Sequence, residues 1–249
     1  MKKKYIILIV VLLFLIIFGY LGYKIFNLYY YNTNDIMEDN YKNFLNKLEI
    51  KNTITINTNS NVDNYLTFKN IKIRNDFEKF KKIDESDDML EYVKYVLYDE
   101  NENAKAGFVF GISDTYVNMF KEDVTVYGDS IKKINDSGLE EFFKKNNITN
   151  DIELFEYLKN NKDVKNNIFT SVKQMKNNYT IHLLSSIAFP SLENYTLIEG
   201  DYTGYIFNSQ NIKEVSILKD DKKYTFTFIK LDYFTDNYIN ELLNTIIID

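Results

Sequence analysis

A run of nineteen residues without a charged side chain, residues 5–23, is the feature that most constrains this chain. Lys2, Lys3 and Lys4 precede the run, and Lys24 ends it. A helix of this length is about 28 Å long at about 1.5 Å per residue, which is close to the hydrocarbon thickness of a bilayer. The run therefore predicts a transmembrane helix, and the lipid bilayer is the first partner that the sequence indicates.

The residues at the two ends of the run predict its topology. Three lysines and the α-amino group precede it, and one lysine follows it, so the positive-inside rule places the N-terminus in the cytoplasm. A cleaved signal peptide has a shorter apolar stretch and an A-x-A-like exit, whereas this exit, GYLGYKIFNLYYY, contains no alanine. We therefore expect an uncleaved signal-anchor in a single-pass protein of the cell membrane, with the C-terminal domain extracytoplasmic.

Composition excludes several classes of protein. The 249 residues include no cysteine and one histidine, which excludes disulfides, thiolate metal sites and histidine-rich metal sites in a single chain. Without the four lysines around the apolar run, 26 basic residues oppose 36 acidic ones, a formal charge of −10. Such a domain repels phosphate backbones, so nucleic acid is not an expected partner.

The choice of polar residues is typical of an AT-rich genome. The chain has 29 lysines, one arginine (Arg74) and 32 asparagines. We interpret the source as a low-GC bacterium, and motifs that consist mainly of asparagine therefore carry little weight.

The hydropathy pattern predicts three parts. Residues 1–31 form a cytoplasmic lysine tip and the transmembrane anchor, residues 32–50 a juxtamembrane helix, and residues 51–249 an extracytoplasmic α+β domain. Alternating apolar residues predict strands near residues 54–56, 65–73, 92–98, 106–112, 195–198, 202–207, 214–218 and 224–229. Asp99–Asn103 and Asp220–Asp221 are the predicted hairpin turns.

Helices are predicted between and after these strands. Two capping boxes, Ser137 with Glu140 and Asn150 with Glu153, indicate helix starts. An apolar stripe from about Asp163 to Pro190 predicts a helix of roughly 25 residues, and a last helix follows Thr235. The predicted fold class is α+β, with an N-terminal transmembrane helix followed by antiparallel β-sheet elements packed with a central helical block and a C-terminal helix.

His182 is the only imidazole that could serve as a general base. It lies on the stripe of the predicted long helix, near Ser185 and Ser186. One histidine on one helix does not form a triad, so we interpret His182 as a partly buried residue bonded to a neighbour.

Two acidic stretches resemble parts of calcium sites. The first consists of Asp84, Glu85, Asp87 and Asp88, and the second, Asp99, Asn101 and Asn103, matches the first three ligand positions of an EF-hand loop. That match ends at Ala104, where the loop needs glycine, and at Phe110, where it needs glutamate. We interpret the second stretch as a turn, and we predict no catalytic, cofactor-binding or metal-binding residue.

The whole layout, an N-terminal tether and an exported α+β domain, resembles the uncharacterised single-pass membrane-anchored proteins of AT-rich bacteria. The closing segment, YTFTFIKLDYFTDNYINELLNTI, is similar to the last strand and helix of PsbP-like domains, which implies an antiparallel sheet backed by helices. The helical block from Ser137 to Phe189 departs from that pattern, and neither resemblance carries a functional residue over to this chain.

These observations lead us to expect a membrane-anchored extracytoplasmic protein without a cofactor and without enzymatic activity. It would bind a protein partner or serve as an accessory domain at the cell surface. The alternative is a carboxylate-dependent cell-surface hydrolase acting on wall or extracellular glycans, and a third hypothesis is an immunity or signalling protein that acts through its membrane segment. The hydrolase requires a cleft with two convergent acidic residues, whereas the binding domain requires an exposed apolar patch.

Overall fold

The computed structural model describes residues 2–32, 50–58, 62–86, 91–122, 139–161, 163–188, 194–209, 211–230 and 232–249. Within these ranges the chain has a mixed α+β structure with six helices and an eight-stranded sheet, which confirms the predicted mixture of helices and strands. The chain divides into two compact units. The sheet unit comprises residues 46–123, 148–154 and 191–249, and the helical unit comprises residues 1–45, 124–147 and 155–190.

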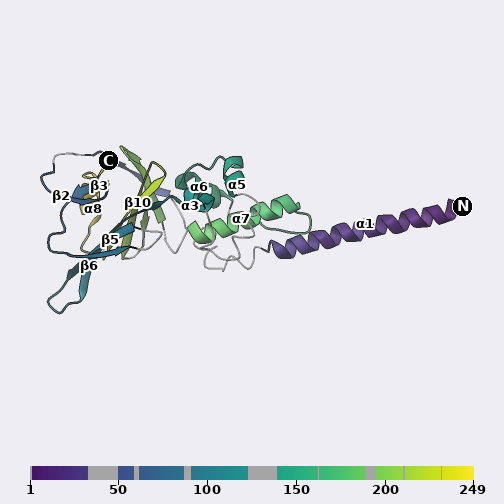
Figure 1. The fold of residues 1–249 in the computed structure, drawn as a ribbon, viewed down its shortest axis with the longest axis horizontal. Coiled ribbons are helices and arrows are strands. Elements are labelled where there is room, and N and C mark those ends of the chain that lie inside the picture. Colours follow the sequence, from purple (N-terminus) through teal and green to yellow (C-terminus); the bar gives the residue numbers. More distant parts are fainter. Residues whose placement is uncertain are drawn as a thin grey trace. The chain divides into compact units, whose positions relative to one another are not determined.

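The eight-stranded sheet is the frame of the sheet unit (Figure 1). Its strands follow one another in the order β1 (Ile50–Ile56), β7 (Asn194–Gly200), β8 (Thr203–Asn208), β9 (Ile212–Lys219), β10 (Lys222–Ile229), β6 (Ala104–Asp114), β5 (Glu91–Tyr98) and β4 (Lys81–Ser86). All neighbouring strands are antiparallel except β1 and β7, which are parallel. The prediction of antiparallel elements therefore needs this one correction, at the edge of the sheet.

Both predicted hairpin turns are present. Asp220 and Asp221, between β9 and β10, have φ angles of 50° and 62°, and two successive left-handed residues give the turn that suits the twist of a hairpin. Between β5 and β6, the Asp99 carboxylate accepts hydrogen bonds from the backbone N–H groups of Asn101 and Asn103, both at 2.9 Å. Local side-chain chemistry thus fixes the two strand reversals.

One face of the sheet buries an aromatic core beneath helix α8 (Asp236–Leu243) and a second, three-stranded sheet. The second sheet has the order β11 (Ile247–Ile248), β3 (Ile71–Arg74) and β2 (Tyr65–Phe68). Phe77 and Phe108 stack in this core with their ring centroids 4.2 Å apart. The predicted last helix is present as α8, and Thr235 caps it, because its hydroxyl accepts the N–H of Tyr238 at 3.3 Å.

The opposite face of the sheet carries both polar and apolar side chains along the neighbouring strands β8 and β9. Residues paired directly across antiparallel strands share a face, which places Tyr205 and Ser216 in one row. Helix α3 (Tyr116–Glu122) and the first turn of α6 (Asp151–Asn160) belong to the same unit, and Asp151 bonds to both α3 and Tyr205.

The helical unit contains α1 (Lys2–Tyr30), α5 (Leu139–Lys145), the rest of α6 and α7 (Val172–Ala188). Asn150 caps α6 as predicted, since its side chain accepts the N–H of Glu153 at 3.0 Å. Glu153, however, accepts the N–H and hydroxyl of Thr149, both at 2.7 Å, rather than completing a capping box with Asn150. The other predicted box includes Ser137, which lies outside the described residues.

Helix α7 is shorter than predicted. It has 17 residues and begins at Val172 rather than near Asp163. The hydroxyl of Ser171 accepts the N–H of Gln174 at 3.2 Å and caps the helix, while Asn167 bonds to the backbone ahead of it. These polar side chains compete with the helical hydrogen bonds, so the apolar stripe overstated the length of the helix.

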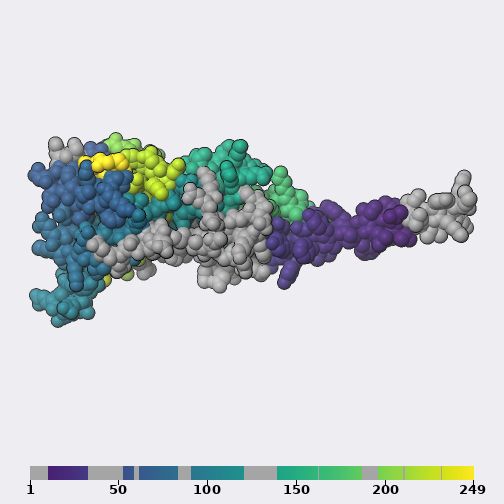
Figure 2. All heavy atoms as spheres, viewed as in Figure 1, coloured from purple at the N-terminus to yellow at the C-terminus, as the bar shows by residue number. Residues whose placement is uncertain are grey.

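The predicted N-terminal apolar helix is present as α1. Residues 11–30 are long and apolar enough to cross a membrane, with a mean hydropathy of 1.9, a property that signal sequences share. Most large side chains between Val11 and Tyr23 are about half exposed or more (Figure 2, purple). The predicted helix over residues 32–50 falls almost wholly outside the described residues, and Ile50 opens β1.

Candidate functional site

A polar hollow of about 680 Å³ lies in the sheet unit, at the edge of the three-stranded sheet and the end of α8. Three chain segments meet there: the stretch before β2, the segment that follows β3, and the residues at the C-terminal end of α8. The lining residues are Val62, Asp63, Asn64, Arg74, Asn75, Asp76, Glu78, Glu241, Asn244 and Thr245. The hollow is therefore lined almost entirely by hydrogen-bonding and charged side chains.

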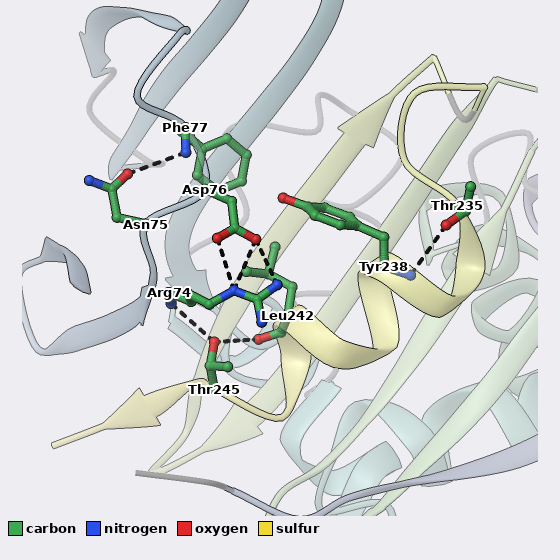
Figure 3. A network of polar contacts seen from close by, with 8 residues as sticks. All are labelled: Arg74, Asn75, Asp76, Phe77, Thr235, Tyr238, Leu242 and Thr245. Atoms are coloured by element: carbon green, nitrogen blue, oxygen red, sulfur yellow. Dashed lines mark hydrogen bonds and ion pairs between the residues drawn. The ribbon is translucent and has the colours of Figure 1, made fainter. Parts of the chain in front are cut away.

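Arg74 and Asp76 form a two-pronged ion pair in the wall of the hollow (Figure 3). The guanidinium Nε donates to both carboxylate oxygens, at 2.9 and 3.0 Å, and Nη2 donates to Oδ2 at 2.7 Å. Asn75 fixes the bend between the two residues, because its side chain accepts the N–H of Phe77 at 3.3 Å. The next residue, Phe77, is buried in the aromatic core, so the Asp76 carboxylate is held in position by this neighbour as well as by Arg74.

The same network ties β3 to α8. The backbone N–H of Arg74 donates to the hydroxyl of Thr245 at 3.0 Å, and that hydroxyl donates to the carbonyl of Leu242 at 2.6 Å. Figure 3 shows the ring of Tyr238 extending from α8 towards Asp76. Burial and then the Asp76 carboxylate raise the pKa of the Tyr238 hydroxyl above its ordinary value.

The hollow carries an excess of negative charge. Among the residues that line it in the described part of the chain, Arg74 is the one cation, and four are acidic: Asp63, Asp76, Glu78 and Glu241. The hydrogen bonds to Asp76 raise the pKa of Arg74, so this residue remains a cation that one of the four carboxylates already neutralises. The three remaining carboxylates make the hollow suited to a cationic group.

A second polar cluster lies on the other face of the large sheet. Asp151 is fully buried and accepts the backbone N–H of Val117 at 3.1 Å and the hydroxyl of Tyr205 at 3.3 Å. The ammonium of Lys223 lies 4.0 Å from the centre of the Tyr116 ring, a cation–π distance, and only 8% of Lys223 is exposed.

Burial dominates the ionisation of this cluster. It raises the pKa of the Asp151 and Glu214 carboxyls, and Lys223 opposes both shifts. Burial likewise lowers the pKa of Lys223, and Asp151 and Glu214 oppose that shift. Because these groups are enclosed, we interpret the cluster as a device that holds α3 and the start of α6 against the sheet rather than as a binding site.

The geometry around His182 agrees with a structural role. Its Nε2 lies 2.6 Å from the carbonyl oxygen of Val164, and the residue is buried. Ser185 and Ser186 each donate to a carbonyl of α7, those of Ile181 and Leu183, both at 2.8 Å. Both hydroxyls thus bond to the backbone of their own helix.

Of the two acidic stretches that resemble parts of calcium sites, the structure describes the second fully and the first only in part. Asp87 and Asp88 lie outside the described residues, as do the side chains of Asp84 and Glu85. In the second stretch the Asp99 side chain closes the β5–β6 turn, and hydrogen bonds from Asn103 and Asn101 hold its pKa below the ordinary value. Within the described residues no group of three or more Asp, Glu, His or Cys side chains is arranged to hold a metal ion.

The sequence analysis did not predict the hollow, although one feature of the sequence, its single arginine, could have indicated it. Arg74 is the single arginine beside 29 lysines, and a site that requires a planar, two-pronged donor cannot use lysine instead. The acidic partners are separated in sequence by up to 178 positions, from Asp63 to Glu241, so no spacing motif connects them.

Comparison with known proteins gives no relative from which a role could be transferred. No protein-family model, curated protein or solved structure matches the chain. The functional argument therefore rests on the residues themselves.

Proposed function

We propose that this is a single-pass membrane-anchored protein that holds a non-catalytic binding or accessory domain outside the cytoplasm. The hollow beside Arg74 receives a basic side chain of a protein partner at the cell surface. The observation that carries this proposal is the excess of carboxylates in the hollow: Asp63, Glu78 and Glu241 remain after Asp76 has neutralised Arg74. Complementary charge favours a lysine or arginine there and speeds its association.

The first helix supports the membrane part of the proposal. Its apolar window meets the length and hydropathy of a membrane span. Lys24 and Asn27, which follow the uncharged run, are buried against the helical unit, with exposed fractions of 6% and 7%. The exit of the run lacks the A-x-A-like site of a cleaved signal peptide, which favours a retained anchor. The positive-inside rule then gives a cytoplasmic N-terminus.

A carboxylate-dependent surface hydrolase is the second candidate, and the same hollow is the specific observation in its favour. Such an enzyme needs two carboxyl groups on opposite sides of a scissile bond, and Glu78 and Glu241 come from different segments of the wall. Neutralising Glu78 and Glu241 should therefore abolish partner binding under the first candidate and hydrolysis under the second.

Photo-crosslinking in intact cells of the native organism tests the proposal. A photoreactive amino acid replaces Asn244, which lines the hollow, in the full-length tagged chain. Crosslinked proteins are identified by mass spectrometry against an untagged control. The double variant Glu78→Gln/Glu241→Gln removes two charges from the hollow. Its matched control, Glu100→Gln/Glu102→Gln, removes two exposed charges from the β5–β6 hairpin of the same unit.

The expected result is one reproducible partner that the hollow variant loses and the hairpin variant keeps. Its recovery should also fall with rising salt before crosslinking, because exposed charges are screened. Equal recovery from both variants would overturn the binding role of the hollow. Hydrolysis of cell-wall fragments by the purified protein, abolished only in the hollow variant, would establish the enzyme instead.

A further inference from the structure

The C-terminal end of α1 is part of the helical unit rather than a free tether. The ammonium of Lys24 donates a hydrogen bond to the carbonyl of Thr170, and the amide of Asn166 donates to the carbonyl of Tyr31 at 2.9 Å. Figure 1 shows the start of α7 beside this end of α1, and the rings of Tyr31 and Tyr179 meet edge to face at 5.8 Å. The segment from Asn166 to Thr170 therefore runs alongside α1.

This segment forms a tight turn whose polar groups are used internally. The side chain of Asn167 accepts the N–H groups of Phe169 and Thr170, at 2.9 and 3.1 Å. In return, the hydroxyl of Thr170 accepts the N–H of Asn167 at 3.0 Å. The turn is thus closed by its own hydrogen bonds, so its two apolar side chains, Ile168 and Phe169, are presented on a defined backbone.

Those two side chains are directed away from the protein interior. Phe169 is 92% exposed, the highest value for a large hydrophobic residue in the described part of the chain, and Ile168 is 39% exposed. Single exposed apolar residues are common on soluble surfaces. Here, however, the segment that carries the pair bonds to Lys24 of α1, and the nearby α1 residues Tyr20 and Tyr23 are 59% and 56% exposed.

The turn descends along α1 towards the apolar run. Asn166 bonds to the carbonyl of Tyr31, and the carbonyl of Thr170 accepts the ammonium of Lys24, which lies seven residues earlier in the sequence than Tyr31. Because the uncharged run ends at residue 23, Thr170 bonds to the first residue after that run.

We propose that the turn of residues 167–170 is a second membrane contact, in which Phe169 and Ile168 enter the boundary between headgroups and acyl chains beside α1. The inference rests on the proposed anchoring by α1 and adds to it a contact from a distant part of the sequence. Aromatic and branched side chains of peripheral segments are buried at that boundary. The Thr170 carbonyl meanwhile provides an acceptor for the Lys24 ammonium at the end of the span.

Tryptophan fluorescence in vesicles tests this contact. The natural chain has no tryptophan, so each substitution introduces a single reporter. Three full-length variants are compared, each replacing an exposed aromatic ring: Phe169→Trp in the turn, Phe14→Trp within the span, and Tyr98→Trp at the end of β5 as the aqueous control. Each is reconstituted in phosphatidylcholine vesicles whose acyl chains carry bromine, a quencher, either near the headgroup or near the chain end.

The expected result for Phe169→Trp is quenching by the lipid brominated near the headgroup, with protection from acrylamide in the water relative to Tyr98→Trp. Phe14→Trp should be quenched more by the deeper bromine. If Phe14→Trp is quenched while Phe169→Trp behaves like Tyr98→Trp, the turn contact is wrong and the anchor stands. If Phe14→Trp is not quenched by either lipid, the anchor and the turn contact both fail. Circular dichroism of the three variants confirms that the fold is kept.

Discussion

Replacing Lys223 by methionine tests the interpretation of the buried charge cluster. Methionine keeps an unbranched side chain of similar length over the Tyr116 ring but removes the cation that faces Asp151 and Glu214. Removing one partner from a buried pair costs about 3–5 kcal/mol, because the remaining charge is left uncompensated. Asp151 keeps its hydrogen bonds from Val117 and Tyr205, so we expect the lower end of that range, about 3 kcal/mol.

The pH dependence of this loss is a stricter test than its size. Lys223 holds down the pKa of Asp151 and Glu214 against the raising effect of burial, so both values rise further in the variant. A carboxyl whose pKa is higher in the folded than in the unfolded state contributes its full stabilisation at a pH below the unfolded-state pKa, which is near 3.8 for Asp151 and 4.5 for Glu214. This contribution is lost as the pH rises through the folded-state pKa. The deficit of Lys223→Met relative to the natural chain should therefore be larger at pH ~8 than at pH ~4.

Urea unfolding of the full-length protein in detergent micelles, followed by circular dichroism at both pH values, measures the deficit. In thermal unfolding a loss of about 3 kcal/mol corresponds to a decrease in Tm of about 6–12 °C for a chain of this size. The control is Lys222→Met, which removes an exposed lysine paired with Asp114 and should cost less than about 1 kcal/mol. Equal losses in the two variants, or a deficit of Lys223→Met that grows on acidification, would refute the assignment.

Two further substitutions probe the sheet and the wall of the hollow. Gly204→Ala would place a Cβ atom 2.0 Å from the backbone carbonyl oxygen of Ser216, so it should lower the free energy of unfolding in urea by about 3 kcal/mol or more. Gly107→Ala is the control, because its Cβ would meet only ordinary contact at 3.4 Å. Similar losses of stability in the two variants would contradict the expectation. Arg74→Lys keeps the charge but loses the two-pronged bond to Asp76, so it should lower stability by about 1–3 kcal/mol; an unchanged Tm would show that the fork is not needed.

The sequence predicted the elements whose causes are local. The β9–β10 turn follows from two adjacent aspartates, residue types that tolerate positive φ, and the start of α8 follows from the hydroxyl of Thr235. The apolar helix α1 follows from a run of uninterrupted hydrophobicity. In each case the determining residues lie within one turn or one run, so a single sequence contains the whole argument.

Where local signals competed, the sequence was misleading. Val164 and Ile168 continued the apolar stripe of α7, yet Asn167 and Ser171 end the helical pattern there by bonding to nearby backbone. Ile168 consequently lies on the exposed turn instead of in a helix. Hydrophobic spacing alone could not decide between these outcomes, since it records side-chain polarity and not which hydrogen bonds the backbone makes.

The long-range assemblies were decided by the tertiary structure alone. The parallel pairing of β1 with β7 joins residues more than 140 positions apart, and the hollow draws Asp63, Arg74 and Glu241 from three segments. The polar residues Lys222 and Lys223 are adjacent in sequence, but the strand directs one to solvent and buries the other. Alternation along a strand assigns side chains to two faces, and only the packing of distant elements decides what each face meets.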